Sequence, residues 1–196
     1  MDPAPTARPR GRPAAASRED VLAAAMRRYL RGERVDVLAI AAELGVGRAT
    51  IYRWFGSREG LIGHVLVQAA EPLLAQARAK ARGRGAHALL DTFDRFNHSL
   101  AAAPALRRFV EVERDAALRI ICSGAGVVQP RIVAMIAEVI EDEVRAGRYE
   151  PAVEPATLAY AIVKLAEAFL FSDAVAGMRG DVDRLREVEA ALLGIG

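Results

Sequence analysis

The chain has 196 residues, 53% apolar and 27% charged, which is enough for one or two domains with a sizeable core. Its single cysteine, Cys122, excludes a disulfide framework and a multi-cysteine zinc site, and the lack of any run of about 18 uncharged apolar residues or of a signal-like segment predicts a cytoplasmic protein without a membrane span. The net charge is only +2, but its distribution is uneven, because residues 1–63 hold 11 Arg and no Lys against 7 acidic residues. This asymmetry indicates binding to nucleic acid. A basic face that is simply solvated is the alternative.

Residues 1–16 are rich in Pro, Ala and Arg, and we expect them to form a disordered basic arm. Within this arm, Pro9-Arg10-Gly11-Arg12-Pro13 is similar to the core of an AT-hook. The similarity implies that Arg10 and Arg12 bind in the DNA minor groove, because the prolines favour an extended backbone and the glycine permits a close approach. The alternative is a basic tail with only a generic electrostatic attraction to DNA.

Helical periodicity, with glycine and proline near the boundaries, predicts an all-α protein of nine helices. Ser17 is predicted to cap the first helix, with Asp20 as its capping-box partner. We expect helices over residues 18–31, 37–44, 48–55, 57–82, 86–101, 104–122, 127–147, 155–178 and 181–193. This order predicts two domains, an N-terminal one over residues 17–63 and a helical one over residues 64–196.

The stretch 35–63 predicts a helix-turn-helix, because two short helices flank the turn Gly45-Val46-Gly47, in which Gly45 suits a left-handed backbone. Their inner faces are predicted to be Leu38, Ala41 and Leu44 in the first helix and Ile51 and Phe55 in the second. The other side chains of the second helix then face outward, where they can bind phosphate or base edges: Arg48, Ala49, Thr50, Tyr52 and Arg53. An ordinary helical hairpin with a polar face is the alternative.

The run from Ile40 to Leu61 resembles the DNA-binding signature of the TetR family of regulators. The most distinctive part is Tyr52-x-x-Phe55 followed by a short turn and the basic Arg58. The resemblance implies that residues 48–54 form a recognition helix in the major groove of operator DNA. The residues expected to touch DNA from this helix then include Thr50, Tyr52 and Trp54.

The resemblance also implies that Arg58, at the start of the next helix, binds a DNA phosphate. Two positions depart from the family pattern. Gly47 stands where the family usually has Ser or Thr, which removes a helix cap and one expected phosphate contact. Arg58 stands where the family usually has Lys, which keeps the charge but changes the hydrogen-bonding geometry.

The family resemblance further implies a homodimer formed by helices 155–178 and 181–193. The first of these is apolar nearly all round and therefore has to be covered on several sides. Such a dimer presents two recognition helices about 34–36 Å apart, which predicts a palindromic operator in double-stranded DNA.

The middle helices carry candidates for an apolar pocket that binds a small effector. These candidates are Phe93, Phe96, Asn97, Phe109, Glu113, Met135, Val139, Tyr160 and Lys164. Plain core packing is the alternative for the aromatic residues. Glu113 is a carboxylate on an otherwise apolar face, which predicts either a ligand contact or a buried pair with a residue such as Lys164. An apolar pocket with a few polar groups suits an acyl or lactone-like effector. The composition and the C-terminal region are also similar to those of QsdR-type regulators within the family, which implies a response to lactone-degradation metabolites.

No signature of an enzyme, a cofactor site or a metal site stands out. His98 can share a helix face with Asp91 and Asp94, but a solvated face is the favoured interpretation. There is no Gly-rich phosphate loop and no nucleophile elbow. The sequence therefore predicts a ligand-responsive repressor in which an effector shifts the long helix 57–82. A helical small-molecule-binding protein without DNA function and an enzyme with a remote site are the alternatives.

Overall fold

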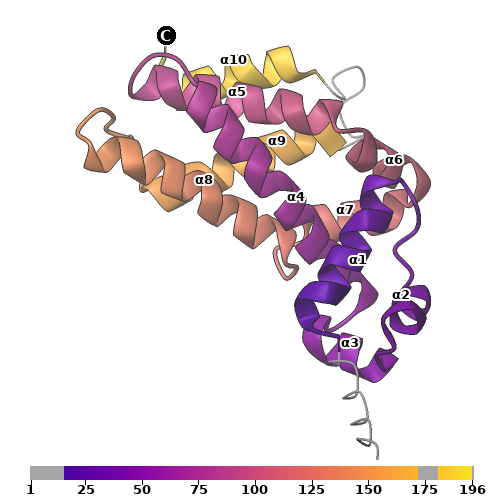
Figure 1. Ribbon diagram of the computed structural model, residues 1–196. Coiled ribbons are helices and arrows are strands. Elements are labelled where there is room, and N and C mark those ends of the chain that lie inside the picture. The colour runs from indigo at the N-terminus through magenta and orange to yellow at the C-terminus, as the bar shows by residue number, and fades with distance from the viewer. Residues whose placement is uncertain (1–15, 172–180, 196) are drawn as a thin grey trace, which may run out of the picture.

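The computed structural model describes residues 16–171 and 181–195, and in these ranges it contains ten helices and no strand. The helices are α1 (Arg18–Leu30), α2 (Val37–Leu44), α3 (Arg48–Phe55), α4 (Arg58–Lys80), α5 (Ala86–Ala102), α6 (Pro104–Val112), α7 (Arg114–Cys122), α8 (Val128–Arg145), α9 (Pro155–Phe171) and α10 (Val182–Leu192). The prediction of an all-α fold is confirmed. Figure 1 shows α1–α3 at one end of the molecule, with α4 running from there into a bundle of the C-terminal helices.

The predicted number of nine helices is wrong, because the segment 104–122 forms two helices. α6 ends at Val112 and α7 starts at Arg114, with Glu113 between them at φ −122° and ψ 45°. No glycine or proline marks this break in the sequence. Instead, the Glu113 carboxylate accepts a hydrogen bond of 2.7 Å from Arg58, far away in the chain, so that a tertiary contact accompanies the break.

The ends of the N-terminal helices follow the local capping rules. The Ser17 hydroxyl accepts a hydrogen bond of 3.1 Å from the Asp20 amide, and the Asp20 carboxylate accepts one of 2.8 Å from the Ser17 amide, which completes the predicted capping box. Gly45 ends α2 in the left-handed region at φ 63°, as expected. α3 covers the predicted residues 48–55, and its N-cap Gly47 provides no side-chain hydrogen bond.

The buried face of α2 differs from the prediction by one position. Val37, Ile40 and Ala41 are buried, whereas Leu38 is 55% exposed. In an eight-residue helix with apolar side chains on adjacent positions, periodicity fits two neighbouring faces equally well. Packing against α1 and α3 decides between them.

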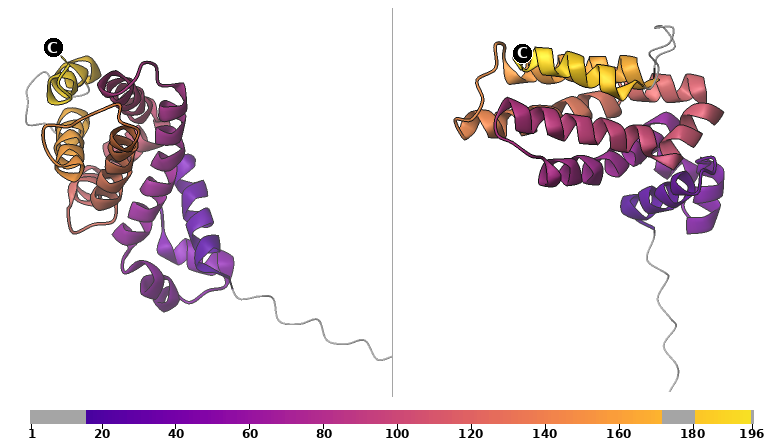
Figure 2. Two further views of the ribbon diagram at one scale, coloured as in Figure 1. Left: turned by 90° about the vertical axis from the view of Figure 1, so that its left-hand side faces the viewer. Right: turned by 90° about the horizontal axis from the view of Figure 1, so that it is seen from above.

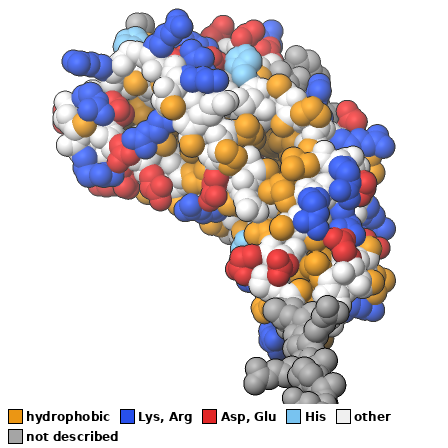
Figure 3. Space-filling view, viewed as in Figure 1, with side chains coloured by type: hydrophobic (Ala, Val, Ile, Leu, Met, Phe, Trp, Pro, Cys, Tyr) orange, Lys and Arg blue, Asp and Glu red, His pale blue; other side chains and the backbone are white. Residues whose placement is uncertain are grey.

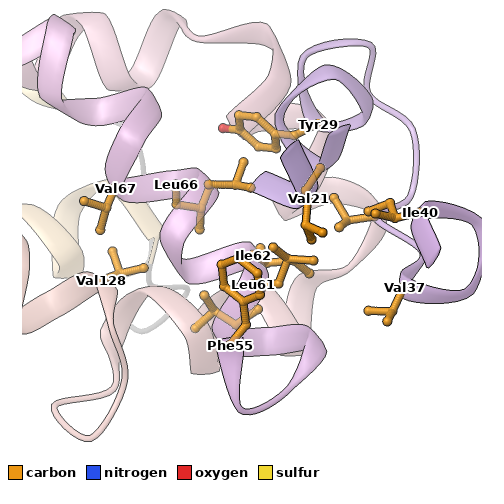
Figure 4. Close-up of a cluster of buried hydrophobic side chains, with 14 of the residues drawn as sticks. Val21, Tyr29, Val37, Ile40, Phe55, Leu61, Ile62, Leu66, Val67 and Val128 are labelled. Carbon is orange, nitrogen blue, oxygen red and sulfur yellow. The ribbon is translucent and has the colours of Figure 1, made fainter. Parts of the chain in front are cut away.

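Two hydrophobic cores fill the described part of the chain, and α4 contributes to both. Figure 4 shows the first core, in which α1, α2, α3 and the first half of α4 pack together and Val67 faces Val128 of α8. Residues of α6 and α7, among them Leu106 and Ile120, belong to this core as well. The second core joins the later half of α4, from Ala70 onward, to α5, α8 and α9. Packing is therefore continuous across residue 63, and α4 connects the two ends of the molecule, as both views of Figure 2 show.

Some of the expected segments fall outside the described residues. This holds for the basic arm with Arg10 and Arg12, and for residues 172–178 of the helix predicted over 155–178. The described part of that helix, α9, carries buried apolar residues such as Leu158 and Ile162. Within the described ranges, no helix has the length and hydrophobicity that crossing a membrane requires.

Candidate nucleic-acid interface and interior cavity

The outer face of α3 is exposed and basic. Ile51 and Phe55 are buried against the first core, which leaves the side chains of Arg48, Ala49, Tyr52 and Arg53 exposed to solvent. Neither Arg48 nor Arg53 forms an ion pair with any residue in the described ranges. α3 lies at the end of the molecule opposite the C-terminal bundle, so none of the bundle helices covers this face (Figure 1). Two unpaired guanidinium groups are thus available to phosphates or guanine edges.

Thr50 and Trp54, the other predicted contacts on this helix, are half-buried. Trp54 packs against the first core rather than standing free on the surface. The inner side of α3 is also held by α1 and α4, because the Phe55 ring packs edge-on against His64 and lies 4.7 Å below the guanidinium carbon of Arg18. This packing fixes the orientation of the exposed face.

Ion pairs hold α2 in place beside α1. Arg27 and Arg28 of α1 lie 2.8 Å and 2.6 Å from the two oxygens of Glu43 on α2. These contacts lower the pKa of the Glu43 carboxyl from its usual value. The arginines of this contact come from the last turn of α1, since α2 has no basic residue. Basic side chains gather on the right-hand side of Figure 3.

Arg58, the expected phosphate ligand, is engaged inside the protein. Its Nε donates a hydrogen bond of 2.8 Å to the Val35 carbonyl, and its Nη2 donates one of 2.7 Å to Glu113. Arg58 thus joins the loop before α2, the start of α4 and the α6–α7 junction. Glu113 accordingly pairs with Arg58 and not with Lys164, whose Nζ lies 2.6 Å from Glu167.

A cavity of about 250 Å³ lies among the C-terminal helices. Its walls come mainly from α4, α5, α8 and α9 and are almost entirely apolar. Among the predicted pocket residues, it is lined by Phe93, Phe96 and Asn97. The other six candidates lie elsewhere: Phe109, Glu113, Met135, Val139, Tyr160 and Lys164. The candidates on α5 are thus brought together, while those on α6, α8 and α9 are not.

The predicted pocket residues that lie outside the cavity do so for different physical reasons. Met135 and Val139 are buried in the second core. Phe109 packs edge-on against Tyr29 at a centroid distance of 6.5 Å. Tyr160 is 52% exposed on the outside of α9. Helical periodicity predicted that these residues face an apolar side, but it did not predict which apolar side encloses a space.

In one polar cluster on the cavity wall, both carboxylate oxygens of Glu167 accept hydrogen bonds. The Gln129 amide donates to both oxygens of Glu167 at 2.7 Å and 3.0 Å and to the Cys122 carbonyl at 3.0 Å. Lys164 donates to the same carboxylate at 2.6 Å. Burial and this neighbouring carboxylate raise the pKa of the Cys122 thiol to about 11, so the thiol is protonated at neutral pH.

A second polar pair on the wall is incomplete. Asn97 Nδ2 on α5 donates a hydrogen bond of 3.0 Å to Glu189 Oε1 on α10. Glu189 is completely buried, and its other oxygen, Oε2, has no hydrogen-bond partner. Burial raises the pKa of the Glu189 carboxyl from 4.5 to about 7.

The burial of Glu189 could have been predicted from the spacing of apolar residues around it. The buried positions on α10 and at its C-cap are Val182, Leu185, Glu189 and Leu193, which follow helical spacing. A carboxylate in that stripe is a buried charge that needs a partner. Gln129, in contrast, carries no such signal, because it becomes a cavity residue only through the packing of α8 on α9.

The cavity also reaches the N-terminal helices. The cavity wall includes the buried Tyr29 and also Leu30, the last residue of α1, together with residues 103–106 of the α5–α6 junction. Figure 3 shows hydrophobic side chains gathered over the middle of this face, between α1 and the C-terminal bundle. A molecule in the cavity would therefore touch the same helix that supports α3.

Two family models match the chain. Residues 21–65 match the model for bacterial regulatory proteins of the tetR family, and residues 84–194 match the model for the tetracyclin repressor-like C-terminal domain. The second match alone spans more than half of the chain. The protein belongs to the TetR family of bacterial transcriptional regulators, which bind DNA and are not enzymes.

Solved structures agree with this assignment. The chain is similar to the TetR-family transcriptional repressor QsdR of R. erythropolis, with 29% identity and a TM-score of 0.84 over 91% of this chain and 94% of that chain. It shares the fold of AlkX, a TetR-family repressor of Dietzia sp. strain DQ12-45-1b, with 24% identity and a TM-score of 0.63 over 91% and 96% of the two chains. No curated protein sequence matches the chain.

Proposed function

We propose that the protein is a cytoplasmic homodimeric repressor that binds a palindromic operator and is released from it by a small apolar, acyl or lactone-like effector. The observation that carries the proposal is the exposed face of α3, on which two arginines have no ion-pair partner among the described residues. Because proteins of the TetR family bind operator DNA, we expect the operator to be the partner of this face.

On the DNA side, we assign Arg48 and Arg53 to phosphates or base edges in the major groove and Tyr52 to a phosphate or base contact. We also assign apolar and hydroxyl contacts with the DNA to Ala49 and Thr50, which are exposed and half-buried on α3. Trp54 and Arg58 support the orientation of this face from within the protein. The arm with Arg10 and Arg12 is proposed to bind the adjacent minor groove.

The dimer is proposed to form through α9 and α10. Tyr160 on α9 is 52% exposed, and Val188 and Leu192 on α10 are 37% and 39% exposed. These apolar side chains lie on the two helices that the family resemblance assigns to the interface. Covering them with a second copy would remove them from water and set the two copies of α3 about 34–36 Å apart.

The effector is proposed to occupy the apolar cavity. The wall is formed by α4 and also by Tyr29 and Leu30 of α1, so an occupant can shift both helices relative to the bundle. Because α1 and α4 hold the inner side of α3 through Arg18, His64 and Phe55, such a shift would move the recognition helix. A ligand that binds better to the shifted state lowers the affinity for the operator.

An electrophoretic mobility shift with the DNA upstream of the protein's own gene tests this function. The wild type should shift the fragment, and Tyr52→Ala and Arg53→Ala should each weaken binding by about tenfold, since each removes a contact with DNA. Arg107→Ala is the matched control, because Arg107 is an exposed arginine on α6, away from α3. A wild type that fails to shift the fragment, or equal effects of Arg53→Ala and Arg107→Ala, would contradict the proposal.

A further inference from the structure

One residue of the cavity wall, Glu189, has a buried carboxylate oxygen without a hydrogen-bond partner among the described residues. The Gln129–Glu167–Lys164 cluster is complete, because each oxygen of Glu167 accepts at least one hydrogen bond. Glu189, also on the wall, has only the bond from Asn97, and its Oε2 is buried without a partner. A buried polar atom of this kind costs free energy unless something else satisfies it.

We propose, on the basis of the proposed effector-binding function, that Glu189 and Asn97 form the polar recognition point of the cavity and that the effector is an uncharged aliphatic compound whose carbonyl oxygen accepts a hydrogen bond from Glu189 Oε2. Asn97 is a positioning residue, since it holds Oε1. Glu189 is the specificity-determining residue, since it touches the ligand.

The protonation of Glu189 follows from its hydrogen bond. Oε1 accepts from the Asn97 amide, so the proton of a neutral carboxyl resides on Oε2, which becomes a donor. Burial in apolar surroundings favours this neutral form and raises the pKa to about 7. A donor at this place selects for an acceptor in the ligand, and a ligand carboxylate would bring a second negative charge into an apolar cavity.

The charged groups around Glu189 are few. On α5, Asp94 raises the pKa of Glu189, and on α10 Arg186 lowers it; these two lie 3.6 Å apart. His98 on α5 lies 3.3 Å from Asp94. From α9 come Lys164 and Glu167, which pair with each other. Only Glu189 among these groups both lines the cavity and lacks a partner for one of its oxygens.

The rest of the wall indicates the shape of the ligand. Leu66, Leu73, Ile132 and Ile136 line the cavity on α4 and α8, and they offer only apolar contacts. The volume of about 250 Å³ lies just below the range of roughly 300–1,000 Å³ that is usual for ligand sites. A short aliphatic chain with one carbonyl group satisfies both the apolar wall and Glu189.

Calorimetry on the full-length protein without DNA tests the inference. The probes are γ-decalactone and 2-decanone, which carry a neutral carbonyl, and decanoate, which has the same chain length but is ionised. At pH 6 the two neutral compounds should bind at least about tenfold more tightly than decanoate. At pH 8.5 their affinity for the wild type should fall by about tenfold or more, because ionised Glu189 no longer donates.

Glu189→Gln keeps a donor that does not titrate, so its affinity for 2-decanone should change by less than about threefold between the two pH values. Glu187→Gln, an exposed position two residues away, and His98→Gln should both retain the wild-type pH dependence. Thermal unfolding of each variant shows that it is folded at both pH values.

Three results would overturn the inference: decanoate binding as tightly as 2-decanone, the same pH dependence in Glu189→Gln as in the wild type, or no binding of either carbonyl compound at either pH. Release of operator DNA is measured separately. Glu189-dependent binding without release would contradict the proposed function and leave the recognition by Glu189 standing.

Discussion

Glu189 is the residue at which burial and charge conflict most directly. Its side chain is completely buried, and among the residues that the structure describes only Asn97 gives it a hydrogen bond. The folded-state pKa of about 7 lies above the ordinary value of 4.5, so folding favours the protonated carboxyl. The corresponding stability is fully present below about pH 4.5 and is lost as the pH rises through about 7.

Glu189→Gln should remove this dependence. Since one pKa unit corresponds to about 1.4 kcal/mol, the free energy of unfolding of the wild type should fall relative to that of the variant by about 2–3 kcal/mol between pH 5 and pH 8. Urea unfolding at both pH values measures the difference, with Glu187→Gln as the exposed control on the same helix. An unchanged difference between wild type and Glu189→Gln would show that Glu189 is not desolvated.

At the scale of elements, a half-buried ion pair joins α4 to the α6–α7 junction. Arg58 and Glu113 are 23% and 17% exposed, and Arg58 also binds the Val35 carbonyl. A second ion pair, Arg119 of α7 with Glu59 of α4, joins the same elements but is 61% and 47% exposed. Both ion pairs connect α4 to the α6–α7 region, but they differ in burial. Comparing them therefore tests how burial changes the strength of an ion pair.

A double-mutant cycle on Arg58→Ala and Glu113→Ala should give a coupling energy of about 1–3 kcal/mol, because each single change leaves a half-buried charge unpaired. The cycle on Arg119→Ala and Glu59→Ala should give less than about 1 kcal/mol, because solvent screens the exposed pair. Urea unfolding measures both. Equal coupling energies would mean that the buried pair does not hold α4 against the junction.

At the scale of the whole molecule, the described chain has apolar side chains on α9 and α10 that it does not cover. Figure 1 shows α10 on the side of the bundle away from α3, as a dimer with two outward-facing recognition helices requires. The proposed interface and the DNA-binding face are thus separate, so substitutions in one leave the side chains of the other unchanged.

Val188→Asp combined with Leu192→Asp should convert the dimer into a monomer, because burying two carboxylates in an apolar interface is unfavourable. Sedimentation velocity should show half the wild-type mass, and operator affinity should fall at least about tenfold as the second recognition helix is lost. Val112→Asp is the matched control, since Val112 is 59% exposed on α6. A wild type that sediments as a monomer would refute the proposed interface.

The sequence alone predicted what depends on neighbouring residues. Ser17 and Asp20 cap α1, Gly45 ends α2, and α3 covers residues 48–55, because capping and left-handed backbone are decided within a few residues. The signature around Tyr52 predicted the family, which the comparisons confirm. The buried and exposed sides of α3 followed from the one-turn spacing of Ile51 and Phe55.

The tertiary structure decided what depends on residues far apart in the chain. The break at Glu113 coincides with the contact to Arg58, 55 residues away, and no local pattern contains that information. Periodicity identified the apolar side of each helix, but whether that side packs into a core, as at Met135, or faces a cavity, as at Phe96, depends on how several helices meet. Glu189 and Asn97, 92 residues apart, lie together because α10 packs on α5, and only that packing creates the buried polar pair on the cavity wall.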